Sequence, residues 1–426
     1  MLSVSSSGAR AAGGRRAAPD PGKEPRMSEP RRSPERERLL AAVERVRGVA
    51  TAHAEASERL RTLAPAVVDA LQSSGLLAMA APRALGGVES DPLTQVEVFE
   101  AMARADASAG WSLMISALLA ALAGGTLPDE GARQVFAGPF PTFAGLQIPT
   151  GLARRVSGGY VLEGRWAFGS GVRHASWVFT CAIVAPEGAA PPAGPPEMIS
   201  LAVPREQVVI EDTWDVAGLR GTGSDHYRIE GALVPEARAC PFPAAPQRRG
   251  GALYSLPLLA LLAAGHVGFA LGVGRRALDE IAAVAPRRVK AWPQLALGSH
   301  AAFHMDLGRA EAKLAAARAY AFDVLGRMWD QARAGEALSI EDWAAIRLVQ
   351  TYVTDVAAEV TGFAYRAGGG GALYAASPLQ RCFRDIHAAT QHIAATDDAY
   401  EFAGRARLGL ADLHPMLAPR PPRAVG

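Results

Sequence analysis

Hydroxyl, imidazole and aromatic side chains gather in three stretches of this 426-residue chain: residues 164–177, 214–224 and 381–392. Ser170 lies between two glycines in the first stretch. Trp214 and Ser224 bound the second, and His392 ends the third. A hydroxyl group both donates and accepts hydrogen bonds, and an imidazole exchanges a proton near pH 7. Such side chains are capable of acid–base chemistry, and Trp166, Phe168 and Trp214 are suited to form apolar walls.

Each of these residues also has a purely structural interpretation. A serine between Gly169 and Gly171 is common in turns. Trp214 could belong to an ordinary β core, and His392 could be a buried histidine bonded to a helix. The residue types alone leave these alternatives open.

Several common active-site motifs are absent from the sequence. It contains no Gly-x-Gly-x-x-Gly, no phosphate-binding Gly-x-x-x-x-Gly-Lys-Ser/Thr and no Gly-x-Ser-x-Gly. His300 and His304 could share a helix face as metal ligands, but no carboxylate accompanies them and a surface pair is preferred. On one continuous helix, His387 and His392 diverge by ~140°, so at most one faces a given pocket. We expect no metal site.

Composition excludes other classes of protein. Hydrophobic residues make up 49% of the chain, and 44 Lys and Arg against 42 Asp and Glu leave a charge of +2, which argues against nucleic-acid binding. The longest apolar run, Trp111–Ala123, is too short to span a membrane and predicts a buried core helix. Three scattered cysteines exclude a disulfide framework, and the N-terminus lacks the apolar stretch of a secretory signal. We expect a cytoplasmic protein.

The pattern of hydrophobic residues predicts a mainly α fold with a central β domain. Helical periodicity covers residues 33–137, and Ser33-Pro34 and Asp91-Pro92 are typical helix starts. Short β-like runs occupy 138–245, with a hairpin turn at Gly158-Gly159. Residues 246–412 return to helix. Terminal segments 1–32, where Met27 is an alternative start, and 413–426 are expected to be disordered or irregular. The helices expected in the last domain cover residues 256–285, 295–334, 339–367 and 379–407.

The three stretches, in this order within an α–β–α chain, resemble the acyl-CoA dehydrogenase superfamily. Segments Pro82–Glu89 and Asp106–Trp111 add to a resemblance that covers about residues 35–412. It is closest to the flavin-dependent monooxygenase branch, the oxygenase components of two-component systems. The resemblance implies an N-terminal α-helical domain, a middle β-barrel and a C-terminal four-helix bundle.

A catalytic carboxylate distinguishes the acyl-CoA dehydrogenases from the monooxygenase branch, and it is missing from the expected place in this chain. Acyl-CoA dehydrogenases remove a proton from an acyl thioester, and many carry the base shortly after the Arg-Asp of the last long helix. That place holds Ile393 here, whereas Asp397, Asp398 and Glu401 lie a turn or more away. A base must come within ~2.6–3.2 Å of its proton. This argues against desaturation, although some dehydrogenases supply the base from an earlier helix.

The resemblance implies a role for each candidate residue. His392 and Ser170 are implied to be catalytic. They would stabilise the C4a-peroxide that forms when reduced flavin reacts with O2. Phe168, Ser170, Trp214 and Ser224 are implied to contact the flavin. Arg287, Arg288 and Lys290 are candidates for its phosphate, of which Arg288 is our choice. We expect reduced FMN, with FAD as the alternative, and O2 as cosubstrate.

The expected function is hydroxylation, or oxidation of nitrogen or sulfur, of a small aromatic or polyketide-like substrate. A separate NAD(P)H-dependent reductase would supply the flavin, because no nicotinamide-binding pattern is present. The resemblance also implies a homotetramer, and Leu256–Gly274 is apolar all round, with Gly268 and Gly272 permitting close helix approach. The alternatives are an acyl-CoA dehydrogenase with bound FAD and a non-catalytic protein of the same fold.

Overall fold

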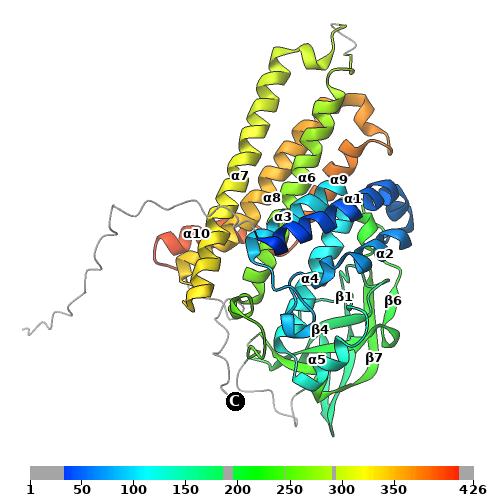
Figure 1. Ribbon diagram of the computed structural model, residues 1–426, viewed down its shortest axis with the longest axis vertical. Coiled ribbons are helices and arrows are strands. Elements are labelled where there is room, and N and C mark those ends of the chain that lie inside the picture. The colour runs from blue at the N-terminus through cyan, green and yellow to red at the C-terminus, as the bar shows by residue number, and fades with distance from the viewer. Residues whose placement is uncertain (1–32, 186–194, 244, 290–293, 412–426) are drawn as a thin grey trace, which may run out of the picture.

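The computed structural model describes residues 33–185, 195–243, 245–289 and 294–411. Both terminal segments, residues 186–194 and Lys290 therefore lie outside the described residues. Helices come first, a sheet follows, and a helical bundle completes the chain, in the order that the sequence predicts (Figure 1).

The N-terminal helices are α1 Pro34–Leu60, α2 Pro65–Ser74, α3 Pro92–Ala105, α4 Ala107–Thr126 and α5 Asp129–Val135. The predicted caps of α1 and α3 are confirmed. The side chain of Ser33 accepts a hydrogen bond from the Arg36 amide, and Asp91 accepts one from the Thr94 amide. A proline follows each cap, at the first helical position, where no amide hydrogen is needed.

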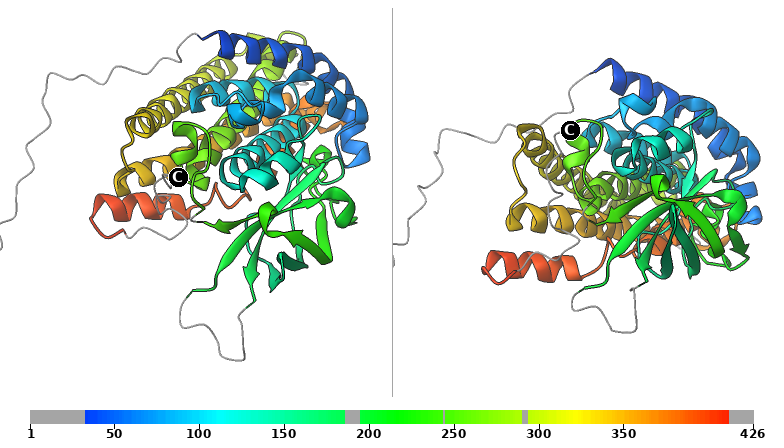
Figure 2. Two further views of the ribbon diagram at one scale, coloured as in Figure 1. Left: turned by 60° about the horizontal axis from the view of Figure 1, so that its bottom comes forward. Right: turned by 90° about the horizontal axis from the view of Figure 1, so that it is seen from below.

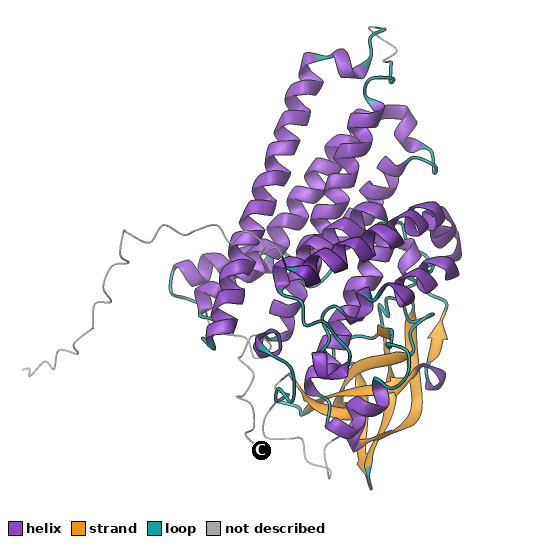
Figure 3. Cartoon of the chain, in the orientation of Figure 1, coloured by secondary structure: helices purple, strands orange, loops and turns teal. Residues whose placement is uncertain are grey.

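The middle segment forms one mixed sheet with the strand order β6-β7-β3-β2-β4-β5-β8, and β1 pairs with β4. Its strands are β1 Phe143–Ala144, β2 Gly151–Val156, β3 Gly159–Trp166, β4 Trp177–Val184, β5 Met198–Pro204, β6 Val209–Glu211, β7 His226–Pro235 and β8 Ala239–Phe242. The predicted hairpin is confirmed, with β2 and β3 antiparallel. Strands β5 and β7 contact each other although they are not neighbours in the order, so the sheet curls. The N-terminal helices cover one face of it (Figures 2 and 3).

The C-terminal helices are α6 Leu258–Val284, α7 Ala301–Ala334, α8 Ile340–Gly368, α9 Pro378–Ala389 and α10 Asp398–Arg407. The first three lie side by side, and α6 ends and α7 begins at the end of the bundle away from the sheet (Figure 1). The continuous helix expected over 379–407 is wrong, because the chain turns between α9 and α10. Residues 379–403 contain neither Gly nor Pro, so the sequence carries no signal for this break.

Two helices, α4 and α6, are long and apolar enough to cross a membrane, but 89% and 83% of their apolar windows are buried within the protein. They pack against each other in the main core. The prediction that Trp111–Ala123 is a buried core helix is confirmed.

Glycines on α6 let it approach α3 closely, as the sequence predicts. A Cβ atom at Gly268 would lie 2.5 Å from the carbonyl oxygen of Val96, and one at Gly272 would lie 2.3 Å from that of Glu100. Both distances are far inside van der Waals contact, and both partners are backbone. Helix α6, which lines the site described below, is therefore fixed in position by these contacts.

Substitution of Gly272 tests this packing. Gly272→Ala places a methyl group against the Glu100 carbonyl and should lower the free energy of unfolding by about 1–3 kcal/mol. The control is Gly308→Ala on α7, where nothing lies within 4 Å. There alanine is the better helix former, and we expect stabilisation of about 0.5–1 kcal/mol. Denaturant unfolding measures both, and a Gly272→Ala protein as stable as the parent would contradict the packing.

Candidate active site

The indole of Trp111 lies where the helices meet the sheet. Helix α4 begins at the Asp106 cap, which accepts the Ala109 amide at 2.8 Å, and Trp111 follows one turn later. The Trp111 Nε1–H donates to Ser170 Oγ at 3.1 Å. Its ring meets three others edge-on, with centroid distances of 5.2 Å to His266, 5.0 Å to Phe269 and 5.5 Å to His392. Trp111 thus joins the two residues predicted to be catalytic.

Two loops are joined around Ser170. The Gly169 amide donates to the Asp225 carbonyl and the Gly171 amide to the Thr222 carbonyl, at 3.0 and 2.9 Å. Ser170 Oγ lies 2.8 Å from Ser224 Oγ. The first and second sequence stretches therefore meet, and two of the predicted flavin-contacting residues are adjacent.

The hydroxyl groups form a chain with a defined direction. The Thr222 hydroxyl donates to the Leu219 carbonyl at 2.8 Å, so the 2.6 Å bond between Thr222 and Ser224 requires Ser224 to donate. Ser170 must then donate to Ser224 while it accepts from Trp111. Because a hydroxyl has one hydrogen and two lone pairs, Ser170 keeps one free acceptor position.

Trp214 is held beside this chain. Its Nε1–H donates to the Leu219 carbonyl and its amide to Asp225 Oδ1, both at 3.0 Å. Asp225 is fully buried and also pairs with Arg173 at 2.6 Å. The indole of Trp214 is partly buried against the core. It therefore packs as a core residue on one side and leaves part of its ring accessible.

Phe168 is the most exposed of the predicted site residues. Its side chain is 61% exposed, and its φ is +58°, a conformation that a non-glycine residue rarely adopts. The ring meets Trp214 edge-on at 6.4 Å. Strain and exposure at one aromatic residue are typical of a ligand-contacting position. In contrast, Trp166 is fully buried and stacks on Tyr227 within the sheet core, so its expected role as a site wall is wrong.

His392 lies in the turn after α9. Its Nδ1 accepts the Ala394 amide at 3.1 Å, so the neutral ring carries its proton on Nε2. Burial lowers the pKa of His392 to about 4. The ring is therefore neutral at pH 7 and presents an N–H donor. The earlier comparison with His387 assumed one continuous helix and does not apply, because His392 is outside α9.

His266 is a site residue that the sequence analysis missed. It lies on α6, is 1% exposed, and its ring centroid is 4.3 Å from that of His392. Burial and the nearby His392 hold the pKa of His266 well below its usual value. The available signal was a single histidine within the otherwise apolar segment 256–274.

Asp385 connects the second and third stretches. Its Oδ1 accepts the Leu219 amide at 2.6 Å, and the side chain is buried. Burial raises the pKa of Asp385 to about 7 against the opposing effect of the Leu219 hydrogen bond; Asp106 and Glu58 also raise it, and Arg384 lowers it. Helix α9, which leads to His392, is thereby tied to the loop that carries Trp214.

The structure does not bring Arg288 to these residues within one chain. Arg288 follows α6, and it donates to the Ala367 carbonyl at 2.5 Å. The C-terminal end of α6 lies at the bundle end away from the sheet (Figure 1). His300 and His304 do not share a helix face, because α7 begins at Ala301, and His304 instead bonds the Gly298 carbonyl. Within the described residues, no group of three metal-ligating side chains occurs.

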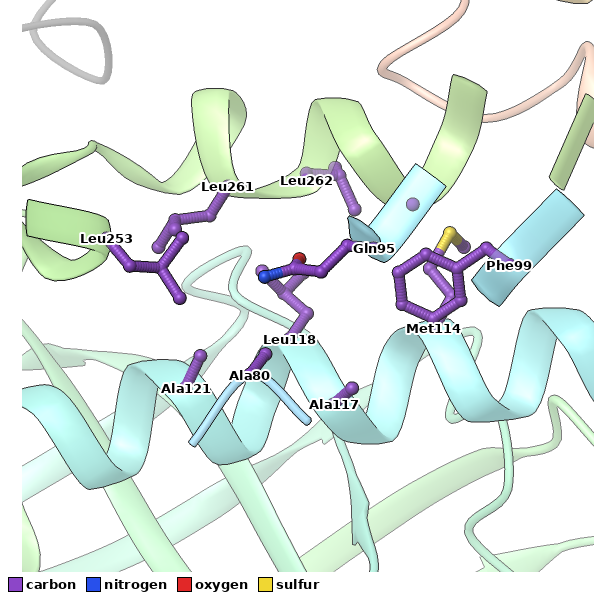
Figure 4. Close-up of a pocket in the computed structure, with 11 residues that line it drawn as sticks. Ala80, Gln95, Phe99, Met114, Ala117, Leu118, Ala121, Leu253, Leu261 and Leu262 are labelled. Atoms are coloured by element: carbon purple, nitrogen blue, oxygen red, sulfur yellow. The ribbon is translucent and has the colours of Figure 1, made fainter. Parts of the chain in front are cut away.

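A small apolar cavity of about 10 Å³ lies between α3, α4 and α6, and its lining does not include His266 or Trp111. Gln95 projects toward its middle, with Phe99 and Met114 at one end and Leu253 at the other (Figure 4). Gly265, the residue before His266, lines it too. The helices that hold Trp111 and His266 thus also enclose an apolar space.

Comparisons with known proteins agree with this geometry. The model of the acyl-CoA dehydrogenase N-terminal domain matches residues 33–126, and that of the C-terminal domain matches 264–397. Indole-3-acetate monooxygenase of Pseudomonas putida is 33% identical over 356 residues, covering 82% of this chain and 87% of that protein. The oxygenase component of FADH2-dependent resorcinol hydroxylase from Rhizobium sp. is 30% identical over 395 residues, with coverages of 88% and 94%. The structure of XiaF from Streptomyces sp. with FADH2 and glycerol has a TM-score of 0.82 at 26% identity, covering 89% and 97%.

Fold and comparisons together define an enzyme of the flavin-dependent monooxygenase class. The chain belongs to the acyl-CoA dehydrogenase superfamily, in the branch formed by the oxygenase components of flavin-dependent monooxygenases. The resemblance drawn from the three sequence stretches is confirmed, as is the fold class.

The pKa of Asp385 gives a pH-dependent prediction. A carboxyl whose pKa is raised by folding binds its proton more tightly in the folded state, so stability falls as pH rises from about 4 to about 7. Asp385→Asn removes this loss of stability, and the asparagine oxygen can still accept a hydrogen bond from the Leu219 amide. The variant should gain on the order of 2 kcal/mol over wild type at about pH 8 and much less at about pH 5.

Thermal unfolding at the two pH values measures this difference. Asp69→Asn, at an exposed position on α2, is the control and should show no such change with pH. An Asp385→Asn protein that is destabilised equally at both pH values would show that the carboxylate is needed as a charge.

Proposed function

We propose that this enzyme uses reduced FMN from a separate NAD(P)H-dependent reductase, together with O2, to hydroxylate or N- or S-oxidise a small aromatic or polyketide-like substrate. The observation that carries the proposal is the pairing of Ser170 and His392 on the two sides of Trp111. The residue after His392 is the apolar Ile393, in the place where a dehydrogenase base is expected.

The side chains fit a reduced flavin. Phe168 and Trp214 offer aromatic edges to a planar ring system, and Ser170 has one free acceptor position. Reduced flavin carries a hydrogen on N5, which oxidised flavin lacks, so an acceptor at that edge favours the reduced form. When bound, reduced flavin supplies the electrons that activate O2.

The residues of this chain then have separate tasks. Neutral His392 presents its Nε2–H as a hydrogen-bond donor and holds a proton at that atom. Ser170 orients the flavin edge, and the rings around Trp111 exclude water. Desaturation is disfavoured because Glu401 and Asp398 are exposed on α10.

We also propose that the enzyme is a cytoplasmic homotetramer. Exposed apolar side chains gather at the bundle end that carries Arg288, which is typical of a surface that contacts another subunit. They include Val289, Leu295, Met305, Leu373 and Tyr374. If Arg288 binds the flavin phosphate, it does so in the site of a neighbouring copy.

Loss of the His392 imidazole should uncouple the reaction. His392→Ala should still bind reduced FMN, but product formed per flavin oxidised should fall about tenfold or more, with H2O2 in its place. Product and H2O2 are measured in the same single turnover. His387→Ala, at an exposed position on α9, is the control. Unchanged coupling in His392→Ala would remove this residue from the mechanism.

Loss of the Ser170 hydroxyl should weaken redox selectivity. Anaerobic titrations give the dissociation constants of reduced and oxidised FMN, and their ratio should change about tenfold in Ser170→Ala, the value of one hydrogen bond. Ser73→Ala, on the surface of α2, should leave the ratio as it is. A ratio that stays constant in Ser170→Ala would mean that Ser170 does not face N5.

A further inference from the structure

One imidazole nitrogen at the site has no partner. Nε2 of His266 is buried and forms no hydrogen bond within the described residues. A buried polar atom without a partner costs about 1–3 kcal/mol, and such atoms are rare in folded proteins. The site hydroxyls and indoles described above are all bonded, so the open hydrogen-bonding positions belong to the two imidazoles, and the one on His266 has no task in the proposed function.

The surroundings of His266 are aromatic. Its ring contacts Trp111 at 5.2 Å and His392 at 4.3 Å, and Phe269 lies one turn further along α6, also against Trp111. These contacts place His266 in the cluster that holds Ser170 and His392. An open hydrogen-bonding position among aromatic rings suits an aromatic ligand with one polar group.

The charge state of the two histidines restricts that group. Two imidazoles this close cannot both be protonated without strong repulsion, and burial disfavours even one charge. Both rings are therefore neutral at pH 7. A neutral imidazole binds a hydroxyl or a ring N–H well, whereas a carboxylate placed here would remain an uncompensated buried charge.

We propose that His266 is a specificity-determining residue, whose Nε2 hydrogen-bonds a neutral hydroxyl or ring N–H on an aromatic substrate. The inference rests on the function proposed above, since it takes the Trp111 cluster to be the place where the organic substrate binds. It adds the atom that recognises the substrate and the kind of group that it recognises.

Phenol and toluene test this because they have nearly the same shape and differ in one hydroxyl. Their dissociation constants are measured by ligand-observed NMR on the full-length protein without flavin or O2. In His266→Phe the ring remains but the nitrogen is lost, so the preference for phenol over toluene should fall about tenfold. His266→Gln, which restores a polar side chain, should recover part of that preference.

His174→Phe is the matched control. His174 also has a nitrogen without a partner, and burial also lowers its pKa to about 4, but it lies outside the rings around Trp111, in a cavity beside Ser112 and Thr142. It should keep the wild-type preference. The inference is wrong if His266→Phe also keeps the preference for phenol over toluene, or if His174→Phe loses this preference to the same extent.

A second measurement does not depend on the variants folding well. In wild-type protein labelled with ¹⁵N-histidine, bound phenol should shift the Nε2 resonance of His266 much further than bound toluene, which can occupy the same place but forms no hydrogen bond. Equal shifts with both ligands, or none with phenol, would overturn the inference. Because neither experiment uses flavin, failure of the oxygenase function would appear separately, as an absence of product in the coupling assay.

Discussion

The Trp111 indole makes the contacts on which the site depends. Its N–H fixes the Ser170 hydroxyl on the sheet side, and its ring packs against His266, Phe269 and His392 on the bundle side. One side chain can do both because an indole has a single polar edge and otherwise apolar surface. Through this one side chain, a serine and a histidine that are far apart in the sequence become part of the same site.

The rest of the fold holds these contacts in place. Helix α4 is buried along almost its whole length, and α6 is pressed against α3 through glycines. Asp385 joins α9 to the loop of Trp214 through the Leu219 amide. Each connection crosses between segments far apart in sequence. The site is therefore a product of the whole three-part fold, which explains why the family resemblance spans nearly the entire chain.

Local signals in the sequence were sufficient to predict much of the fold. Ser33 and Asp91 cap helices because their side chains satisfy free amides. In the β2–β3 hairpin, Gly158 lies in the turn with a positive φ, and Gly159 is the first residue of β3. The break after α9 could not be predicted, because no Gly or Pro marks it in the sequence. His266 was missed for a related reason. Within an apolar helix, one histidine gives no sign of which ring it will meet, and residue types did not show that Trp166 faces the sheet core.

The central claim is that a serine hydroxyl and a neutral imidazole, joined by one indole, face the same flavin. A crystal structure of the anaerobic complex with reduced FMN tests it most directly. The account predicts Ser170 Oγ within hydrogen-bond distance of flavin N5, the His392 ring on the same side, and the Trp111–Ser170 bond intact. An Asp or Glu carboxylate over the reactive nitrogen, with His392 directed elsewhere, would contradict it.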